Sequence, residues 1–148
     1  MSSPRPLSTE MVHASSVAKD GRAVLITGPS GSGKSDLSLR LLDHGFVLVS
    51  DDQTLVRRDG GRLLASAPSQ IAGKLEVRGI GIVEVEAVGE VPVSLLVELR
   101  SDIERLPDDS QSRSILGIEV PVVSVDAMTA SAASKVAIAL DWLGLRQE

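Results

Sequence analysis

Eight consecutive residues carry the pattern of a phosphate-binding loop, G-x-x-x-x-G-K-[ST]. They are Gly28, Pro29, Ser30, Gly31, Ser32, Gly33, Lys34 and Ser35. Glycines in such a loop let successive backbone N–H groups converge on phosphate oxygens. The lysine would reach the β- and γ-phosphates, and the final serine hydroxyl would bind Mg²⁺. The pattern therefore predicts a site for a nucleoside triphosphate; the alternative is a Gly/Ser-rich turn between a strand and a helix.

A pair of adjacent acids forms a second candidate group. Asp51 and Asp52 follow the apolar run at residues 46–49, which predicts a buried strand. In open α/β sheets, ligands gather at the carboxyl ends of strands. One acid could orient Mg²⁺ or the loop, and the other could accept a proton from a hydroxyl nucleophile. The alternative is a solvated turn or a helix N-cap.

Glu76 and Arg78 form a third candidate group, with glycines at positions 79 and 81 beside them. Because they are two residues apart, they would share one face of a strand. An acid for Mg²⁺ and a base for a phosphate suit phosphoryl transfer. An exposed ion pair next to a β-bulge explains the same residues equally well.

Two further residues are weaker candidates. His13 is expected in the strand next to the loop strand, where its charge could tune a neighbouring carboxylate. A lone histidine on a strand is more often a surface or hydrogen-bonded residue. Arg105 lies in a charged segment, where most arginines are simply solvated.

The flanks of the loop are those that a nucleotide site needs. Residues 23–27 predict a buried strand before the loop, and residues 36–42 predict a helix after it. Asp20-Gly21 predicts a hairpin turn that joins the loop strand to a strand at residues 12–17. Further strands are expected at residues 46–49, 54–58, 62–65, 91–99 and 120–125. The residues at 75–83 show an apolar alternation with two glycines, those at 103–114 predict a loop or exposed segment, and those at 131–143 predict a closing helix. The predicted fold is a single α/β domain with a mixed, strand-rich sheet and few helices.

Composition narrows the functional class. The chain has 148 residues, enough for one domain with a core. It has no cysteine and two histidines, which excludes disulfides, thiolate zinc sites and histidine-rich metal sites. A net charge of −5, with one Trp, one Phe and no Tyr, argues against a nucleic-acid partner. No apolar run approaches the length of a membrane span, so we expect no membrane partner and a cytoplasmic location.

The candidate groups combine into a recognisable pattern. In order and spacing it resembles the catalytic domain of the HPr kinase/phosphorylase family, over roughly residues 11 to 125. The residues that carry the resemblance are His13, the loop from Gly28 to Ser35, Val49-Ser50-Asp51-Asp52, and Leu75-Glu76-Val77-Arg78-Gly79-Ile80-Gly81-Ile82. The last stretch is similar to that family's signature, and the match as a whole is more specific than the phosphate loop alone.

The resemblance implies a fold like that catalytic domain and the related phosphoenolpyruvate carboxykinases. It implies an enzyme that uses ATP and Mg²⁺ to phosphorylate a serine of HPr, the small carrier protein of the sugar phosphotransferase system. Carried over by position, Lys34 would hold the phosphates, and Ser35 and Glu76 would hold Mg²⁺. Asp52 would be the general base, supported by Asp51 and tuned by His13. Arg105 would be a catalytic arginine.

Two departures from the family pattern shape the expectations. About ten residues precede the first predicted strand. We therefore expect a flexible tail at residues 1–10 and a kinase domain at residues 11–148. This corresponds to a short form without the family's N-terminal domain. Residues 125–131 stand where the family has a Pro/Arg/Gly-rich stretch linked to dephosphorylation. Phosphorolysis and assembly into a homo-oligomer are therefore left open, and the kinase direction is the main expectation.

Two other functions remain alternatives at this point. One is a phosphate-loop kinase of a small molecule, for which the chain is short to build a closed substrate pocket. The other is a regulatory module that binds ATP without turning it over. The presence of Asp51, Asp52 and Glu76 together favours an enzyme, because sensing does not need a base.

Overall fold

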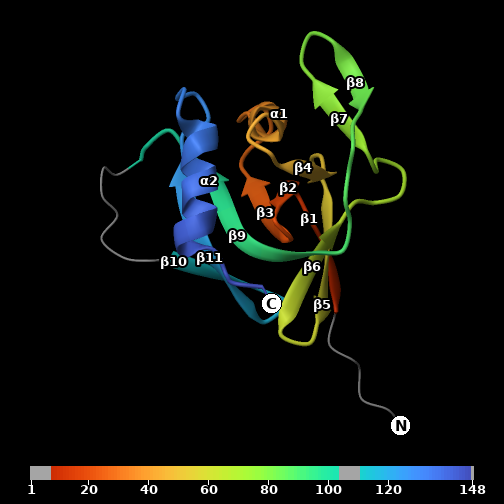
Figure 1. Cartoon of the computed structure of the whole chain (residues 1–148), viewed down its shortest axis with the longest axis vertical. Helices are drawn as coiled ribbons and strands as arrows, with labels where there is room; N and C mark the ends of the chain where they lie inside the picture. The colour runs from red at the N-terminus through yellow and green to blue at the C-terminus, as the bar shows by residue number, and fades with distance from the viewer. Residues whose placement is uncertain (1–7, 104–110, 148) are drawn as a thin grey trace.

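The computed structural model describes residues 8–103 and 111–147, which form eleven strands and two helices (Figure 1). The strands are β1 (Thr9–Val12), β2 (Ser15–Lys19), β3 (Arg22–Thr27), β4 (Val47–Ser50), β5 (Thr54–Asp59), β6 (Arg62–Ser66), β7 (Lys74–Val77), β8 (Gly81–Glu84), β9 (Val91–Leu99), β10 (Gln111–Ile115) and β11 (Ile118–Val125). The helices are α1 (Lys34–Leu42) and α2 (Ala132–Leu143). The predicted α/β class with few helices is confirmed.

The central strand is β9, which pairs with three other strands. Its registers with β3 and with β11 are both parallel, and β6 pairs antiparallel with its first residues. The other pairs of the sheet are antiparallel, which gives the order β1-β5-β6-β9-β3-β2-β4, with β11 and then β10 attached to β9. The sheet is therefore mixed, as expected. The hairpin of β7 and β8 forms a separate two-stranded sheet.

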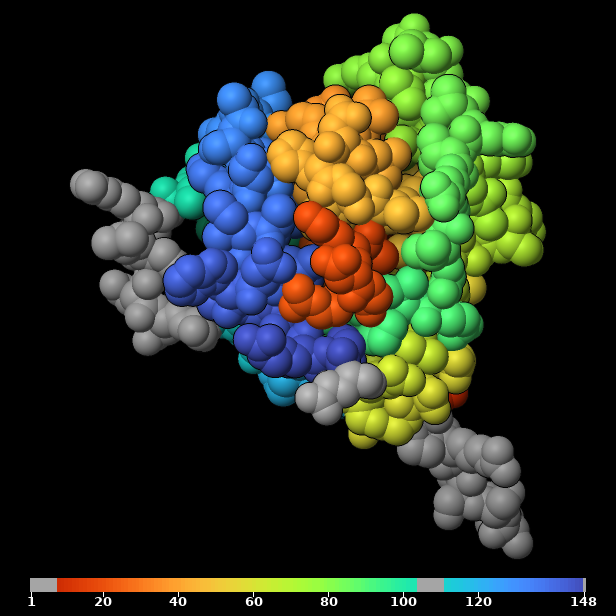
Figure 2. Space-filling view, in the orientation of Figure 1, coloured from red at the N-terminus to blue at the C-terminus, as the bar shows by residue number. Residues whose placement is uncertain are grey.

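Both faces of the central strands are buried. Along β3, Val24 and Ile26 pack in a core that also contains Leu37 of α1 and Val136 of α2. The intervening Leu25 packs in a second core. This core also contains residues of β5 and β6, such as Val56 and Leu63. Both helices cover the first face, and Figure 2 shows them side by side with the β7–β8 hairpin rising next to α1. This double burial explains why β3 is continuously apolar from Ala23 to Ile26.

The strand that leads into the phosphate loop is set by a tight hairpin. Asp20 and Gly21 both have positive φ, 52° and 75°. Two central residues with positive φ define the turn that matches the twist of a two-residue hairpin. The turn pairs β2 with β3 over their whole length, from Ser15↔Ile26 to Lys19↔Arg22. The predicted hairpin is confirmed.

One expected strand was wrong, and two other stretches form elements that the sequence expectations did not name. The expected strand at residues 12–17 is two strands, because β1 pairs with β5 whereas β2 pairs with β3 and β4. The chain must bend between them, and His13 lies in that bend instead of within a strand. The alternation at residues 75–83 is the β7–β8 hairpin, and the end of the expected loop at residues 103–114 is strand β10.

The first strand starts at Thr9, two residues before the expected start of the folded domain. Among the described residues, no helix is both long and apolar enough to cross a membrane.

Candidate active site

The phosphate loop fills the turn between β3 and α1. Gly31 and Gly33 have φ of 79° and 103°, a region that favours glycine. A Cβ on Gly33 would lie 3.2 Å from the Cβ of Ala127, so this glycine also permits close packing of the loop after β11. Helix α1 begins at Lys34, so its N-terminal N–H groups and positive dipole end lie at the loop. The backbone here has the features of an anion site.

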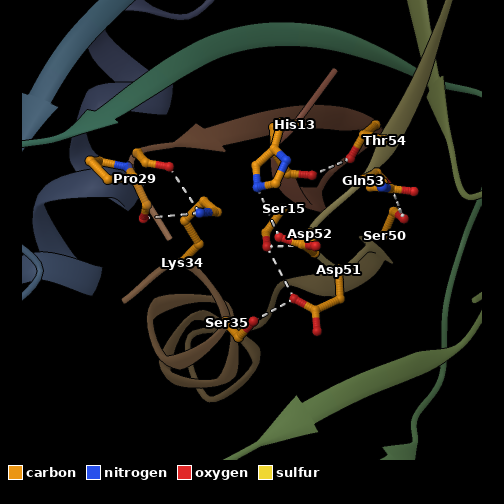
Figure 3. A network of polar contacts seen from close by, with 12 residues as sticks. His13, Ser15, Pro29, Lys34, Ser35, Ser50, Asp51, Asp52, Gln53 and Thr54 are labelled. Atoms are coloured by element: carbon orange, nitrogen blue, oxygen red, sulfur yellow. Dashed lines mark hydrogen bonds and ion pairs between the residues drawn. The ribbon is translucent and has the colours of Figure 1, made fainter. Parts of the chain in front are cut away.

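The Lys34 side chain lies over the loop that it belongs to. Its Nζ donates hydrogen bonds to the carbonyl oxygens of Gly28, at 2.9 Å, and Pro29, at 3.2 Å (Figure 3). An ammonium group has three N–H donors, and these two bonds use two of them. The charge is therefore held at the loop and retains a donor for a phosphate oxygen.

Asp51 forms the buried part of the site directly after β4. Its Oδ1 accepts hydrogen bonds from the Ser35 hydroxyl at 2.6 Å and the Ser15 hydroxyl at 3.1 Å. Its Oδ2 accepts the backbone N–H of Glu76 at 3.0 Å. Burial of a carboxylate is costly unless donors surround it, and here three do. Asp51 thereby connects the phosphate loop to the β7–β8 hairpin.

Asp52 is the next residue and has a different environment. Its φ of 66° lies in the left-handed region, where asparagine and aspartate are among the few non-glycine residues found regularly. Its N–H donates to the Ser15 hydroxyl at 3.0 Å, and its Oδ1 lies 3.2 Å from His13 Nε2 (Figure 3). The His13 and Asp52 side chains are 57% and 58% exposed. The bend at His13 and the turn at Asp52 thus bring this pair together at the surface.

An open pocket of about 270 Å³ unites these elements. Its lining residues are Ser30, Gly31, Gly33, Lys34, Ser35, Asp36, Asp52, Glu76, Val77 and Arg78. The expectation that the loop and the acid pair face one crevice is confirmed for Asp52, which lines the pocket. Asp51 does not line the pocket, but it accepts a hydrogen bond from Ser35, which does. The expectation that Glu76 and Arg78 share a strand face is wrong, because Arg78 lies in the turn after β7. Both residues nevertheless line the pocket.

The oxygen donors of the site fit a magnesium ion that arrives with a nucleotide. Mg²⁺ in nucleotide sites typically has one or two carboxylate contacts, with phosphate and water oxygens completing the octahedron. The Ser35 hydroxyl and Asp51 carboxylate are in contact, and Glu76 lies at the same pocket. Within residues 8–103 and 111–147, no group of three or more acidic or histidine side chains could hold a metal by itself. The donor set is thus one that phosphate oxygens would complete.

Residues 6–141 match the family described as the HPr Serine kinase C-terminal domain. The chain belongs to this family. The resemblance inferred from the residues is therefore confirmed. The stretch from Leu75 to Ile82, which resembled the family signature, lies in the β7–β8 hairpin.

Named relatives and a solved structure agree with this assignment. The chain is 38% identical over 130 residues to the HPr kinase/phosphorylase of Chlorobium limicola, covering 78% of this chain and 39% of that protein. It is 36% identical over 126 residues to that of Clostridium botulinum strain Eklund 17B, covering 77% and 41%. The chain thus spans about two fifths of the length of these relatives. The Hpr(Ser) kinase/phosphatase structure from Coxiella burnetii superposes with a TM-score of 0.78 at 29% identity, covering 89% of this chain and 94% of that one.

Most of the candidate residues lie together in this HPr kinase C-terminal domain. Lys34, Ser35, Asp52 and Glu76 line one pocket, and Asp51 and His13 contact it through Ser35 and Asp52. Arg105 falls outside the described residues. Sequence reasoning missed Ser15, which contacts both acids. The available signal was a serine within the strand expected at residues 12–17, two residues after the candidate histidine.

Proposed function

We propose that this chain is an ATP- and Mg²⁺-dependent protein-serine kinase whose acceptor is an HPr-type phosphocarrier protein of the phosphotransferase system. Membership of the HPr serine kinase C-terminal domain family supports the kinase and the acceptor class. The observation that carries the proposal is the pocket that contains both the phosphate loop and the Asp52 carboxylate. We propose a cytoplasmic location on the same basis, because ATP and an HPr-type acceptor would both be available there.

The proposed binding of the nucleotide follows from the loop. Backbone N–H groups of the loop, to which Pro29 contributes none, would bind the phosphate oxygens together with the N-terminus of α1 and Lys34, and the positive charge there would neutralise that of the phosphates. Ser35 and Glu76 would hold Mg²⁺, which supplies further charge neutralisation when bound. Asp51 keeps the Ser35 hydroxyl oriented through its 2.6 Å hydrogen bond. Catalysis by such a site is positioning and electrostatic stabilisation in place of covalent chemistry.

The proposed transfer step depends on Asp52. The acceptor serine oxygen bonds to the γ-phosphorus, the bond from that phosphorus to the bridging oxygen breaks, and ADP leaves. Asp52 takes the proton that the serine hydroxyl loses. His13 contacts Oδ1 of Asp52 and so restricts the orientation of the carboxylate. Arg105 remains a predicted catalytic arginine.

The test is an assay of the purified chain with ATP, Mg²⁺ and an HPr-type protein, read by mass spectrometry for phosphoserine. An acceptor with alanine at the regulatory serine is the matched control. Transfer to the first acceptor and not to the second supports the proposal. Transfer only to a member of a metabolite panel would replace it by a small-molecule kinase, and tight ATP binding without any transfer would replace it by a sensing module.

The same assay addresses the reverse direction. Inorganic phosphate is added to the phosphorylated acceptor after the nucleotide has been removed. The proposal concerns the kinase direction, so release of phosphate from the acceptor, detected as pyrophosphate, would extend the activity to phosphorolysis. The controls are the same acceptor without the chain and the chain with Asp52→Asn.

A further inference from the structure

Ser15 lies fully buried at the start of β2, between the two acids of the site. Its hydroxyl donates to Oδ1 of Asp51 at 3.1 Å and accepts the backbone N–H of Asp52 at 3.0 Å (Figure 3). A serine hydroxyl has one O–H and two lone pairs, so both bonds form at once without competition. One buried oxygen atom therefore links the two acids, which are 36 and 37 positions away in the sequence.

The two bonds act on different parts of the acids. On Asp51 the hydroxyl contacts the side chain, which also bonds to Ser35 of the phosphate loop. On Asp52 it contacts the backbone, at a residue whose φ is 66°. A left-handed conformation at a non-glycine residue persists only when its surroundings hold it. The hydrogen bond from the Asp52 N–H to Ser15 stabilises this backbone conformation, and the direction of the Asp52 side chain depends on it.

We propose that Ser15 is a positioning residue for phosphoryl transfer, and this inference rests on the proposed function. Its hydroxyl fixes the Asp52 backbone relative to the Ser35–Asp51 pair and so sets the distance from the base to the bound phosphates. A displacement of about 1 Å in such a site can cost about 100-fold in rate. Ser15 does not line the pocket, so its removal should affect the rate of transfer more than nucleotide binding.

Ser16 provides a matched control for a purely structural role. It is the next residue of β2, is also fully buried, and its hydroxyl also makes a hydrogen bond. Its partner is the Thr54 hydroxyl at 2.8 Å, which is not an acid of the site. If buried hydroxyls of β2 matter only for stability, replacement of either serine by alanine should have the same effect on activity.

The experiment compares Ser15→Ala with Ser16→Ala by steady-state kinetics and thermal unfolding. We expect Ser15→Ala to lower kcat by about 10- to 100-fold, and the upper figure is the cost of a displacement of about 1 Å. We expect its KM for ATP to change by less than about threefold. A loss in kcat with little change in KM is expected when the lost interaction acts mainly in the transition state. Ser16→Ala should lose similar thermal stability and keep its kcat. Ser15→Cys, which keeps the buried volume, should lower kcat in the same direction if the alanine variant does not fold.

A second measurement does not need activity. Amide hydrogen exchange followed by NMR should be faster at Asp52 in Ser15→Ala and unchanged there in Ser16→Ala. The inference is overturned if kcat falls equally in both alanine variants, if the loss lies in KM for ATP, or if Asp52 exchange is unaltered in Ser15→Ala. An inactive parent protein would instead overturn the proposed function, and the exchange experiment would still test the Ser15–Asp52 link.

Discussion

Asp51 and Asp52 are adjacent in sequence but belong to two physically different regions of the site. The floor, as we define it, comprises Ser15, Ser35 and Asp51, with Asp51 only 8% exposed and bonded to three donors. The rim comprises His13 and Asp52, whose side chains are more than half exposed. Successive residues reach opposite environments because the chain turns through a left-handed conformation at Asp52.

This difference separates two requirements of phosphoryl transfer. A carboxylate enclosed by hydrogen-bond donors has one fixed orientation, which suits the holding of a serine hydroxyl and a metal. A carboxylate that is more than half exposed at the rim is accessible to the hydroxyl of a protein acceptor. Substitutions of Ser35 and Asp51 should therefore reduce stability and metal–nucleotide binding, and rim substitutions should reduce transfer alone. Ser15 bonds to both acids, so its substitution should reduce stability and the rate of transfer.

The largest effect should come from the rim. Asp52→Asn removes the proton acceptor and retains the shape, and asparagine tolerates the left-handed conformation. We expect the rate of transfer to an HPr-type acceptor to fall by about 10²- to 10⁴-fold, the contribution of a general base. Affinity for ATP, measured by titration of a fluorescent analogue, should be retained. A near-parental transfer rate would show that Asp52 is not the base.

The second effect is on the free energy of unfolding, which a floor substitution should lower more than a rim substitution. Asp51→Ala leaves the N–H of Glu76 and two serine hydroxyls without their acceptor, and we expect a loss of about 1–3 kcal/mol in the free energy of unfolding. Asp52→Asn is the comparison and should change that free energy by less than about 0.5 kcal/mol, as for other exposed sites. Urea unfolding of both variants measures this. Equal losses would mean that floor and rim do not differ energetically.

The third effect concerns the metal. Ser35→Ala and Glu76→Ala should each weaken binding of the Mg²⁺–nucleotide complex, by about tenfold for a lost interaction near 1.4 kcal/mol. Titrations are run with Mg²⁺ and with EDTA in its place. The difference between variants and parent should vanish in EDTA. If neither variant changes affinity in the presence of Mg²⁺, both residues are removed from the proposed metal site.

Local sequence was sufficient to predict the phosphate loop and its flanks. The strand, the loop from Gly28 to Ser35 and helix α1 are contiguous, and the Asp20-Gly21 turn sets β2 against β3 through its own backbone conformation. The turn at Gly60 and Gly61 likewise joins β5 to β6. In each case the residues that determine the conformation lie within the segment that adopts it.

The arrangement of floor and rim could not be predicted in the same way. The bend at His13 exists because β1 pairs with β5, where Met11 lies opposite Leu55. The third donor to Asp51 is a backbone N–H of Glu76, which no residue type reveals. The Ser15 contacts join β2 to the end of β4 through their register at Ser16↔Ser50. These contacts depend on which distant segments of the chain pair with each other. Hydrophobic periodicity predicts individual strands and helices but not their pairing.

The smallest effect should come from His13, and it completes the contrast between the two regions. A polar contact between two exposed side chains is typically worth about 0–1 kcal/mol, so His13→Gln should leave the urea unfolding midpoint almost unchanged. Because its Nε2 lies 3.2 Å from Oδ1 of Asp52, its loss frees the carboxylate to rotate, and we expect kcat to fall only a few-fold. The variant should not alter Mg²⁺–nucleotide affinity. A marked loss of stability or of nucleotide affinity would place His13 with the floor and would remove the division between the regions.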